Sequence, residues 1–262
     1  MSLERLGRAA APVLVGALLL GSWEMLVRWR GIPPYVLPGP LAVARALASD
    51  GPSLAGSLLF TLKVTGLALL GSALLGALLA VLLAQSRWVE QSLFPYAVAL
   101  QVTPVVSIAP LIIIWVQDTF LALLACAWIV AFFPVLSNTT LGLRSADPNL
   151  VELFRLYGAT RWQTLRLLKL PAALPYFLAG LRISGGLALV GAVVAEFVAG
   201  TGGAETGLAF RILESGYRLQ IPRMFAALLL LALAGVAIHV VLSALSHWLL
   251  RHWHASALPQ ER

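Results

Sequence analysis

The side chains that could do chemistry are concentrated in one stretch, residues 144–171. The chain is only 11% charged, yet this stretch carries five basic and two acidic residues. Neither here nor elsewhere does the sequence show a nucleophile–base set, a Gly-x-x-x-x-Gly-Lys phosphate loop or metal-ligand spacing. The four histidines fall in the last 24 residues without acidic or thiol partners, so no metal site is expected. The chemistry available to residues 144–171 is therefore recognition by charge and hydrogen bonding, as on a docking surface.

The first half of this stretch has the pattern of a short amphipathic helix. Asp147 is a favourable N-cap, and Pro148 suits the first helical position, where its missing N–H is no loss. Gly158 is placed to end the helix in the left-handed conformation. An apolar stripe follows from the i, i+3, i+4, i+7 spacing of Leu150, Leu153, Phe154 and Tyr157.

The second half predicts another short helix. Thr160 and Gln163 have the spacing of a capping box at its start, and Pro171 is expected to close it. Together the two halves predict a helix–turn–helix that its charges hold outside the membrane.

The rest of the chain has the composition of an integral membrane protein. Of its 262 residues 60% are hydrophobic, and the mean hydropathy is +0.91. Its apolar runs are longer than the roughly 20 residues that a helix needs to cross a bilayer, and they lack the alternation of a barrel. The predicted fold class is all-α. The net charge of +7 does not indicate nucleic-acid binding, because the basic residues lie in short loops beside apolar spans.

Six transmembrane helices are expected. Residues 1–8 form the N-terminus, 9–28 an uncleaved first span and 29–55 an extracytoplasmic loop with a short surface helix from residue 40. Residues 56–250 form the membrane-spanning core and 251–262 a tail. A glycine-rich loop and a polar stretch are expected between the last two spans. The core spans are 56–84, 92–116 (interrupted by three prolines), 120–141, 173–199 and 224–250.

The distribution of basic residues predicts the orientation. Six spans place both termini on one side, and with that side inside, ten basic residues are cytoplasmic and six are outside. Residues 144–171 are then cytoplasmic, and Glu196 lies toward the outer face.

A few polar side chains within the spans are candidates for a translocation path. The prolines of span 92–116 leave backbone carbonyls without donors, which suits either a kinked packing helix or the wall of a water-lined cavity. For the neutral candidates, the alternative role is hydrogen bonding between helices. Glu196 could instead pair with Arg182 or a loop arginine, or lie at the membrane interface. The candidates are Gln101, Thr103, Ser107, Asn138, Thr139 and Glu196.

Residues 144–171 resemble the cytoplasmic EAA loop of ABC-importer permeases. Glu152 is followed six residues later by Gly158, and Leu168-x-Leu170-Pro171 comes at the family's distance. Leu153 and Phe154 replace the two alanines of the motif. From about residue 20 to 245 the chain resembles the nitrate/sulfonate/taurine branch, which includes thiamine-pyrimidine-precursor and riboflavin permeases. Segments that carry this resemblance include 158–163, 170–176, 179–183, 37–40 and 132–134.

The resemblance implies a type I importer permease in a bacterial inner membrane. Such a chain binds no cofactor itself; ATP and Mg belong to a partner ATPase. The implied assembly is a permease homodimer with two ABC ATPase subunits and an extracytoplasmic binding protein, surrounded by membrane lipid. The implied cargo is a small solute such as a sulfonate, nitrate, taurine or a thiamine pyrimidine. The residues expected to couple the permease to the ATPase are Glu152, Leu153, Phe154, Tyr157, Gly158, Ala159, Arg161, Arg166 and Pro171.

Two other functions fit the sequence less well. An ion-driven secondary transporter usually shows internal repeats of hydropathy, and none is evident. A membrane-embedded enzyme acting on lipid-linked substrates needs an intramembrane catalytic cluster, whereas Glu24, Lys63, Arg182 and Glu196 are widely scattered.

Overall fold

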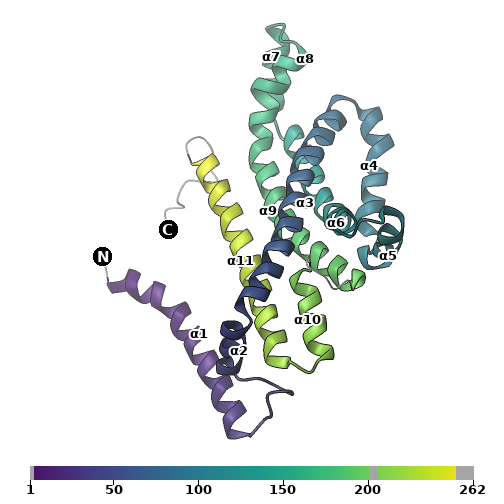
Figure 1. Cartoon of the computed structure of the whole chain (residues 1–262). Helices are drawn as coiled ribbons and strands as arrows, with labels where there is room; N and C mark the ends of the chain where they lie inside the picture. The colour runs from purple at the N-terminus through teal and green to yellow at the C-terminus, as the bar shows by residue number, and fades with distance from the viewer. Residues whose placement is uncertain (1–2, 201–205, 252–262) are drawn as a thin grey trace. The chain divides into compact units, whose positions relative to one another are not determined.

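The structure is a computed structural model, and it describes residues 3–200 and 206–251 (Figure 1). Every regular element within these residues is helical, which confirms the predicted all-α fold. The helices divide into two compact units, one formed by residues 1–59 and 202–232 and the other by residues 60–201 and 233–262. The division falls inside two long helices, α3 (Gly51–Gln85) and α11 (Ile221–Leu250).

The first unit contains α1 (Leu3–Trp29), α2 (Pro40–Ser49) and α10 (Leu208–Tyr217), with the first residues of α3 and α11. The Glu24 side chain of α1 holds the start of α2, because its Oε2 accepts a hydrogen bond from the free N–H of Leu41 (3.2 Å) and its Oε1 accepts one from Arg28 Nε (2.7 Å). A Cβ at Gly39 would lie 2.5 Å from Glu24 Oε2, so a larger residue there would require the Glu24 carboxylate to move. The buried core of the unit is Val43, Leu54, Leu208, Ile212, Ala226 and Ala227.

The helix α10 was not predicted, since the sequence indicated a polar stretch there. Its N-cap, Gly207, offers no side-chain hydrogen bond, so the usual sign of a helix start is missing. Its last turns are held by Glu214, which pairs with Arg211 (3.0 Å), Arg218 (2.9 Å) and Arg223 (3.6 Å). Burial of the Glu214 carboxyl acts to raise its pKa, but the Arg211 hydrogen bond and the charges of all three arginines outweigh burial and hold the pKa below its ordinary value.

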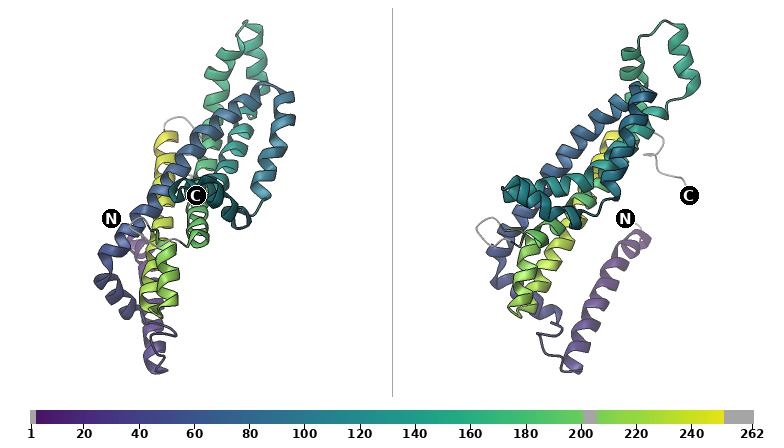
Figure 2. Two further views of the ribbon diagram at one scale, coloured as in Figure 1. Left: turned by 45° about the vertical axis from the view of Figure 1, so that its right-hand side comes forward. Right: turned by 90° about the vertical axis from the view of Figure 1, so that its right-hand side faces the viewer.

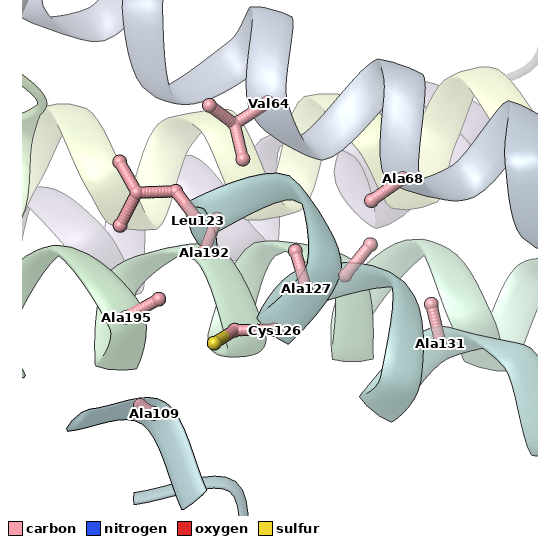
Figure 3. Close-up of a cluster of buried hydrophobic side chains, with 10 residues drawn as sticks. Val64, Ala68, Ala109, Leu123, Cys126, Ala127, Ala131, Ala192 and Ala195 are labelled. Carbon is pink, nitrogen blue, oxygen red and sulfur yellow. The ribbon is translucent and has the colours of Figure 1, made fainter. Parts of the chain in front are cut away.

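The second unit is built around α6 (Thr119–Arg144) and α9 (Leu170–Ala199), which pack along most of their length. Glycines bring the two helices close together, as small residues commonly do between membrane helices. A Cβ on Gly180 would lie 2.7 Å from the Pro134 carbonyl oxygen, and one on Gly191 would lie 2.9 Å from the Ala127 Cα. Figure 3 shows the alanine-rich cluster at this contact, to which α3 contributes Val64 and Ala68.

Two shorter helices of this unit are α4 (Arg87–Val102) and α5 (Val105–Val116). They meet at an angle of 99°, so the expected span 92–116 is a bent pair and not one interrupted rod. The bend falls at Thr103, whose backbone is extended (φ −73°, ψ 120°), because a residue before proline is driven out of the helical region and Pro104 lacks an N–H.

Among the described residues, four helices are long and apolar enough to cross a membrane, or five if the bent pair counts as one span. Three of the four, α3, α6 and α11, contain the predicted spans 56–84, 120–141 and 224–250. The fourth runs from Arg161 to Ala199 and includes α9, where span 173–199 was predicted. The predicted first span, 9–28, lies inside α1, which is not among the four.

Candidate coupling site

The predicted helix–turn–helix is present as a hairpin at one end of the second unit, where a turn connects α7 (Pro148–Leu156) to α8 (Arg161–Thr164) (Figures 1 and 2). We call residues 147–169 the coupling hairpin. Asp147 caps α7 as expected, its Oδ1 accepting a hydrogen bond from the N–H of Asn149 (2.8 Å).

Gly158 ends α7 as the sequence indicated. Its φ is +71°, and two hydrogen bonds surround it: the Gly158 N–H donates to the Arg155 carbonyl (3.0 Å) and the Ala159 N–H donates to the Phe154 carbonyl (2.9 Å). This pair of bonds defines a Schellman motif, which requires a left-handed residue at the glycine position. The turn therefore follows directly from one glycine.

The capping box at the start of α8 is also present. The Thr160 N–H donates to Gln163 Oε1 (2.7 Å), and the Gln163 N–H donates to Thr160 Oγ1 (3.2 Å). The prediction that Pro171 closes this helix is wrong. The chain passes through a π-helical turn, η1 (Leu165–Lys169), and continues as α9, with Pro171 in its first turn. The π turn shifts the bonding so that the Leu170 N–H donates to the Leu165 carbonyl, and the helix continues past the proline without a break.

The apolar stripe of α7 is formed and stays largely exposed in the described chain. No residue of α7 is buried; Leu150 and Leu153 keep 44% and 45% of their surfaces, and Phe154 is half-buried. Tyr157, just after the helix, is 84% exposed, and Trp162 on α8 is 64% exposed. A stripe of large apolar side chains held open on a rigid hairpin is the feature of a binding surface.

The charged residues predicted for coupling lie around this stripe. Glu152 reaches Arg155 one turn further on at 3.9 Å, and both side chains are exposed, so this pair contributes little to the stability of the hairpin. Arg161 begins α8 and Arg166 lies on η1; both are exposed. Among the described residues neither guanidinium has a carboxylate within 4.0 Å.

The candidates for a translocation path fall into separate places. Gln101 and Thr103 lie at the α4–α5 bend and Ser107 on the first turn of α5. Gln101 and Ser107 are exposed, while the Thr103 hydroxyl donates to the Ala99 carbonyl (2.7 Å).

The other three candidates lie on α6 and α9. Asn138 and Thr139 donate to carbonyls of their own helix, at Pro134 (2.8 Å) and Val135 (2.6 Å). Glu196 is buried on α9, where its Oε1 accepts a hydrogen bond from Thr61 Oγ1 of α3 (2.8 Å). That hydrogen bond joins α3 and α9, a role that the sequence had suggested for the neutral candidates and not for Glu196.

The structure also shows a polar cavity that the sequence did not indicate. It has a volume of about 650 Å³ and lies between α9 and α11. Arg182 lines this cavity and has no carboxylate within 4.0 Å among the described residues. The sequence signal that could have marked the site is a cation inside a predicted span. The cavity's polar lining is Ser145, Tyr176, Arg182, Ser243, Ser246 and His247.

Comparison with known proteins agrees with this arrangement. The chain is 38% identical to the riboflavin transport system permease protein of Chloroflexus aurantiacus over 248 residues (91% of this chain and 88% of the relative). It is 34% identical to the formylaminopyrimidine transport permease protein of Halalkalibacterium halodurans over 239 residues (89% and 92%). A probable ABC transporter permease protein of Haemophilus influenzae is 32% identical over 240 residues (92% and 96%).

A solved structure shares the fold. The crystal structure of an amino acid ABC transporter with histidines superposes with a TM-score of 0.62 at 20% identity, over 78% of this chain and 96% of that one. The family model for the inner membrane component of binding-protein-dependent transport systems matches residues 72–255, which include the whole coupling hairpin. The chain belongs to this family of inner membrane components of binding-protein-dependent transport systems.

Proposed function

We propose that the coupling hairpin of this permease subunit binds a separate ATPase and transmits the motion of that ATPase to the membrane helices. The observation that carries the proposal is the open apolar stripe of α7. Leu150 and Leu153 are about half exposed on a helix whose two ends are fixed by the Asp147 cap and the Gly158 turn. Burying such side chains against a partner is worth about 25 cal/mol per Å² of apolar surface, which makes a groove of complementary shape on the ATPase the expected partner.

The way the hairpin is joined to the membrane helices supports the same role. α8, η1 and α9 form one helical run from Arg161 to Ala199, so the hairpin has no hinge loop between itself and the apolar span. We propose that ATP and Mg are bound by two ATPase subunits, each seated on one hairpin of a permease homodimer. An extracytoplasmic binding protein would deliver the solute on the opposite side of the membrane, with both termini and the hairpin in the cytoplasm.

The cargo that we propose is a small solute, with a heteroaromatic ring compound as the first choice. Two of the relatives above have names that state their cargo, riboflavin in one and formylaminopyrimidine in the other. The polar cavity between α9 and α11 is lined by hydroxyls, an imidazole and a guanidinium, which suit the ring nitrogens and carbonyls of such compounds. Binding measurements on the partner binding protein, with riboflavin, pyrimidines, sulfonates and nitrate side by side, would identify the class.

Binding of the cognate ATPase to the full-length permease in nanodiscs tests the coupling role. Leu153→Asp places a charge in the middle of the stripe, and because Leu153 is 45% exposed the change should leave the permease folded. Truncation or polarisation at the centre of an interface typically costs at least 1–2 kcal/mol, so affinity should fall by about 5–30-fold.

Leu156→Asp is the matched control. Leu156 is a 77% exposed residue of the same helix, about 110° around its axis from the centre of the stripe. Its substitution should leave ATPase affinity unchanged. Equal ATPase binding by the wild type and by Leu153→Asp would refute the proposal.

A further inference from the structure

A second cavity lies against the inner face of the coupling hairpin, where it meets the membrane helices. Its volume is about 360 Å³, within the range of ligand sites. Three cationic side chains line it: Arg155 from α7, Arg161 from α8 and Lys169 from η1. Its other polar groups are Gln85 and Thr164, and no acidic residue lines it. The lining is therefore that of an anion site.

Carboxylates of the described chain leave most of this charge uncompensated. Arg161 and Lys169 have none within 4.0 Å, and Arg155 has only the exposed Glu152 at 3.9 Å. The adjoining cavity, which Lys169 also lines, does contain Glu90, but Arg144 is already paired with that carboxylate. Three cations gathered around one space without a counter-charge favour a ligand that brings its own negative charge.

The position of the cavity relative to the ends of the apolar helices indicates the source of the anion. Gln85 is the last residue of α3, directly after its apolar run, and Lys169 directly precedes α9. Trp88 nearby in the chain is 81% exposed and Trp162 on α8 is 64% exposed, and exposed tryptophans mark the interface between hydrocarbon and water. The cavity therefore lies at the level of lipid headgroups.

We propose that this cavity binds a phosphate-bearing anion, and that its source is the headgroup of an anionic phospholipid in the leaflet on the hairpin side. Basic pockets between membrane helices bind such headgroups, and a guanidinium with an ammonium is a suitable donor set for a phosphodiester. A carboxylate of the ATPase is disfavoured, because the cavity is lined from the face of α7 that carries Val151 and Arg155, away from the open stripe. The bound headgroup would join the end of α3 to the hairpin.

Native mass spectrometry of the full-length permease without any ATPase tests this site. The chain in detergent is titrated with dioleoyl phosphatidylglycerol, with dioleoyl phosphatidylcholine or with inorganic phosphate. Near a membrane surface each basic residue contributes attraction that corresponds to about fivefold in affinity. Lys169→Gln should therefore weaken phosphatidylglycerol binding by about fivefold, and Arg155→Gln with Lys169→Gln by about 25-fold.

Arg166→Gln is the matched control, since Arg166 is a basic residue of the same π turn that does not line the cavity. It should leave the affinity unchanged, and Lys169→Arg should bind phosphatidylglycerol as the wild type does. The proposal is overturned if Arg166→Gln and Lys169→Gln weaken binding equally, or if inorganic phosphate binds as tightly as the lipid. It is also overturned if Lys169→Gln binds phosphatidylglycerol as tightly as the wild type does. Because no ATPase is present in the titration, its result does not depend on the coupling role.

Discussion

Replacing Gly158 with valine tests the most specific link between sequence and coupling. Gly158 has φ +71°, and a Cβ at this position would meet no atom within 4 Å, so a substitution acts through backbone strain alone and not through a clash. An L-residue in the left-handed region costs about 1–2 kcal/mol, and a β-branched residue lies at the upper end. The two Schellman bonds would be lost or weakened, and α7 would no longer turn back onto α8.

The size of the effect follows from that strain. A penalty of about 1–2 kcal/mol on the docked geometry lowers ATPase affinity by about 5–30-fold. Gly158→Asn is the control, because asparagine tolerates the left-handed conformation and should keep most of the affinity. The assay is binding of the cognate ATPase to the permease in nanodiscs, together with solute uptake in cells. Wild-type affinity and uptake in Gly158→Val would refute the docking role of the hairpin.

Three further predictions concern the packing and charge of the two units. Gly180→Ala should destabilise the protein by about 1–3 kcal/mol and lower its melting temperature in detergent, because the new Cβ would lie 2.7 Å from a backbone oxygen of α6. Gly186→Ala is the control on the same helix: its Cβ would meet nothing within 4 Å, so the melting temperature should not change. Thr61→Val should destabilise the protein by about 1–3 kcal/mol, since the buried Glu196 carboxylate loses a donor, whereas Glu196→Gln keeps an acceptor oxygen and should cost less; equal melting temperatures would contradict this order. Because the pKa of Glu214 is lowered in the folded state, its stabilising contribution is complete above its ordinary value of about 4.3 and is lost as the pH falls through the lowered one; Glu214→Gln should remove that acid-side dependence in pH-resolved melting curves.

Local rules of helix capping were enough to predict most of the coupling hairpin. Asp147, Gly158 and the Thr160–Gln163 pair each act within five residues, so the local sequence contains all the groups that decide the conformation. Pro171 was misread because a π turn just before the proline accommodates the missing N–H.

Tertiary packing limited the rest of the prediction. The prolines of residues 92–116 indicated an interruption, but the 99° angle at Thr103 depends on what α5 packs against. For Asn138 and Thr139 the sequence left open a cavity or hydrogen bonds between helices. In the structure both side chains donate to carbonyls of their own helix, which neither alternative predicted. The cavity at Arg182 was missed because its lining comes from α9 and α11, about 60 residues apart in the chain.

The continuous helix from Arg161 to Ala199 has a mechanical consequence. Its 39 residues make a rod of about 58 Å, and a pivot near one end converts a tilt of about 5° into a displacement of about 5 Å at the other. The π turn at Leu165–Lys169 lies close to the hairpin end, where a local change of pitch twists the short arm more than the long one. The stiffness of this rod and the flexibility of the π turn would together determine how much of a displacement applied by a partner at the hairpin is transmitted to the part of the helix inside the bilayer.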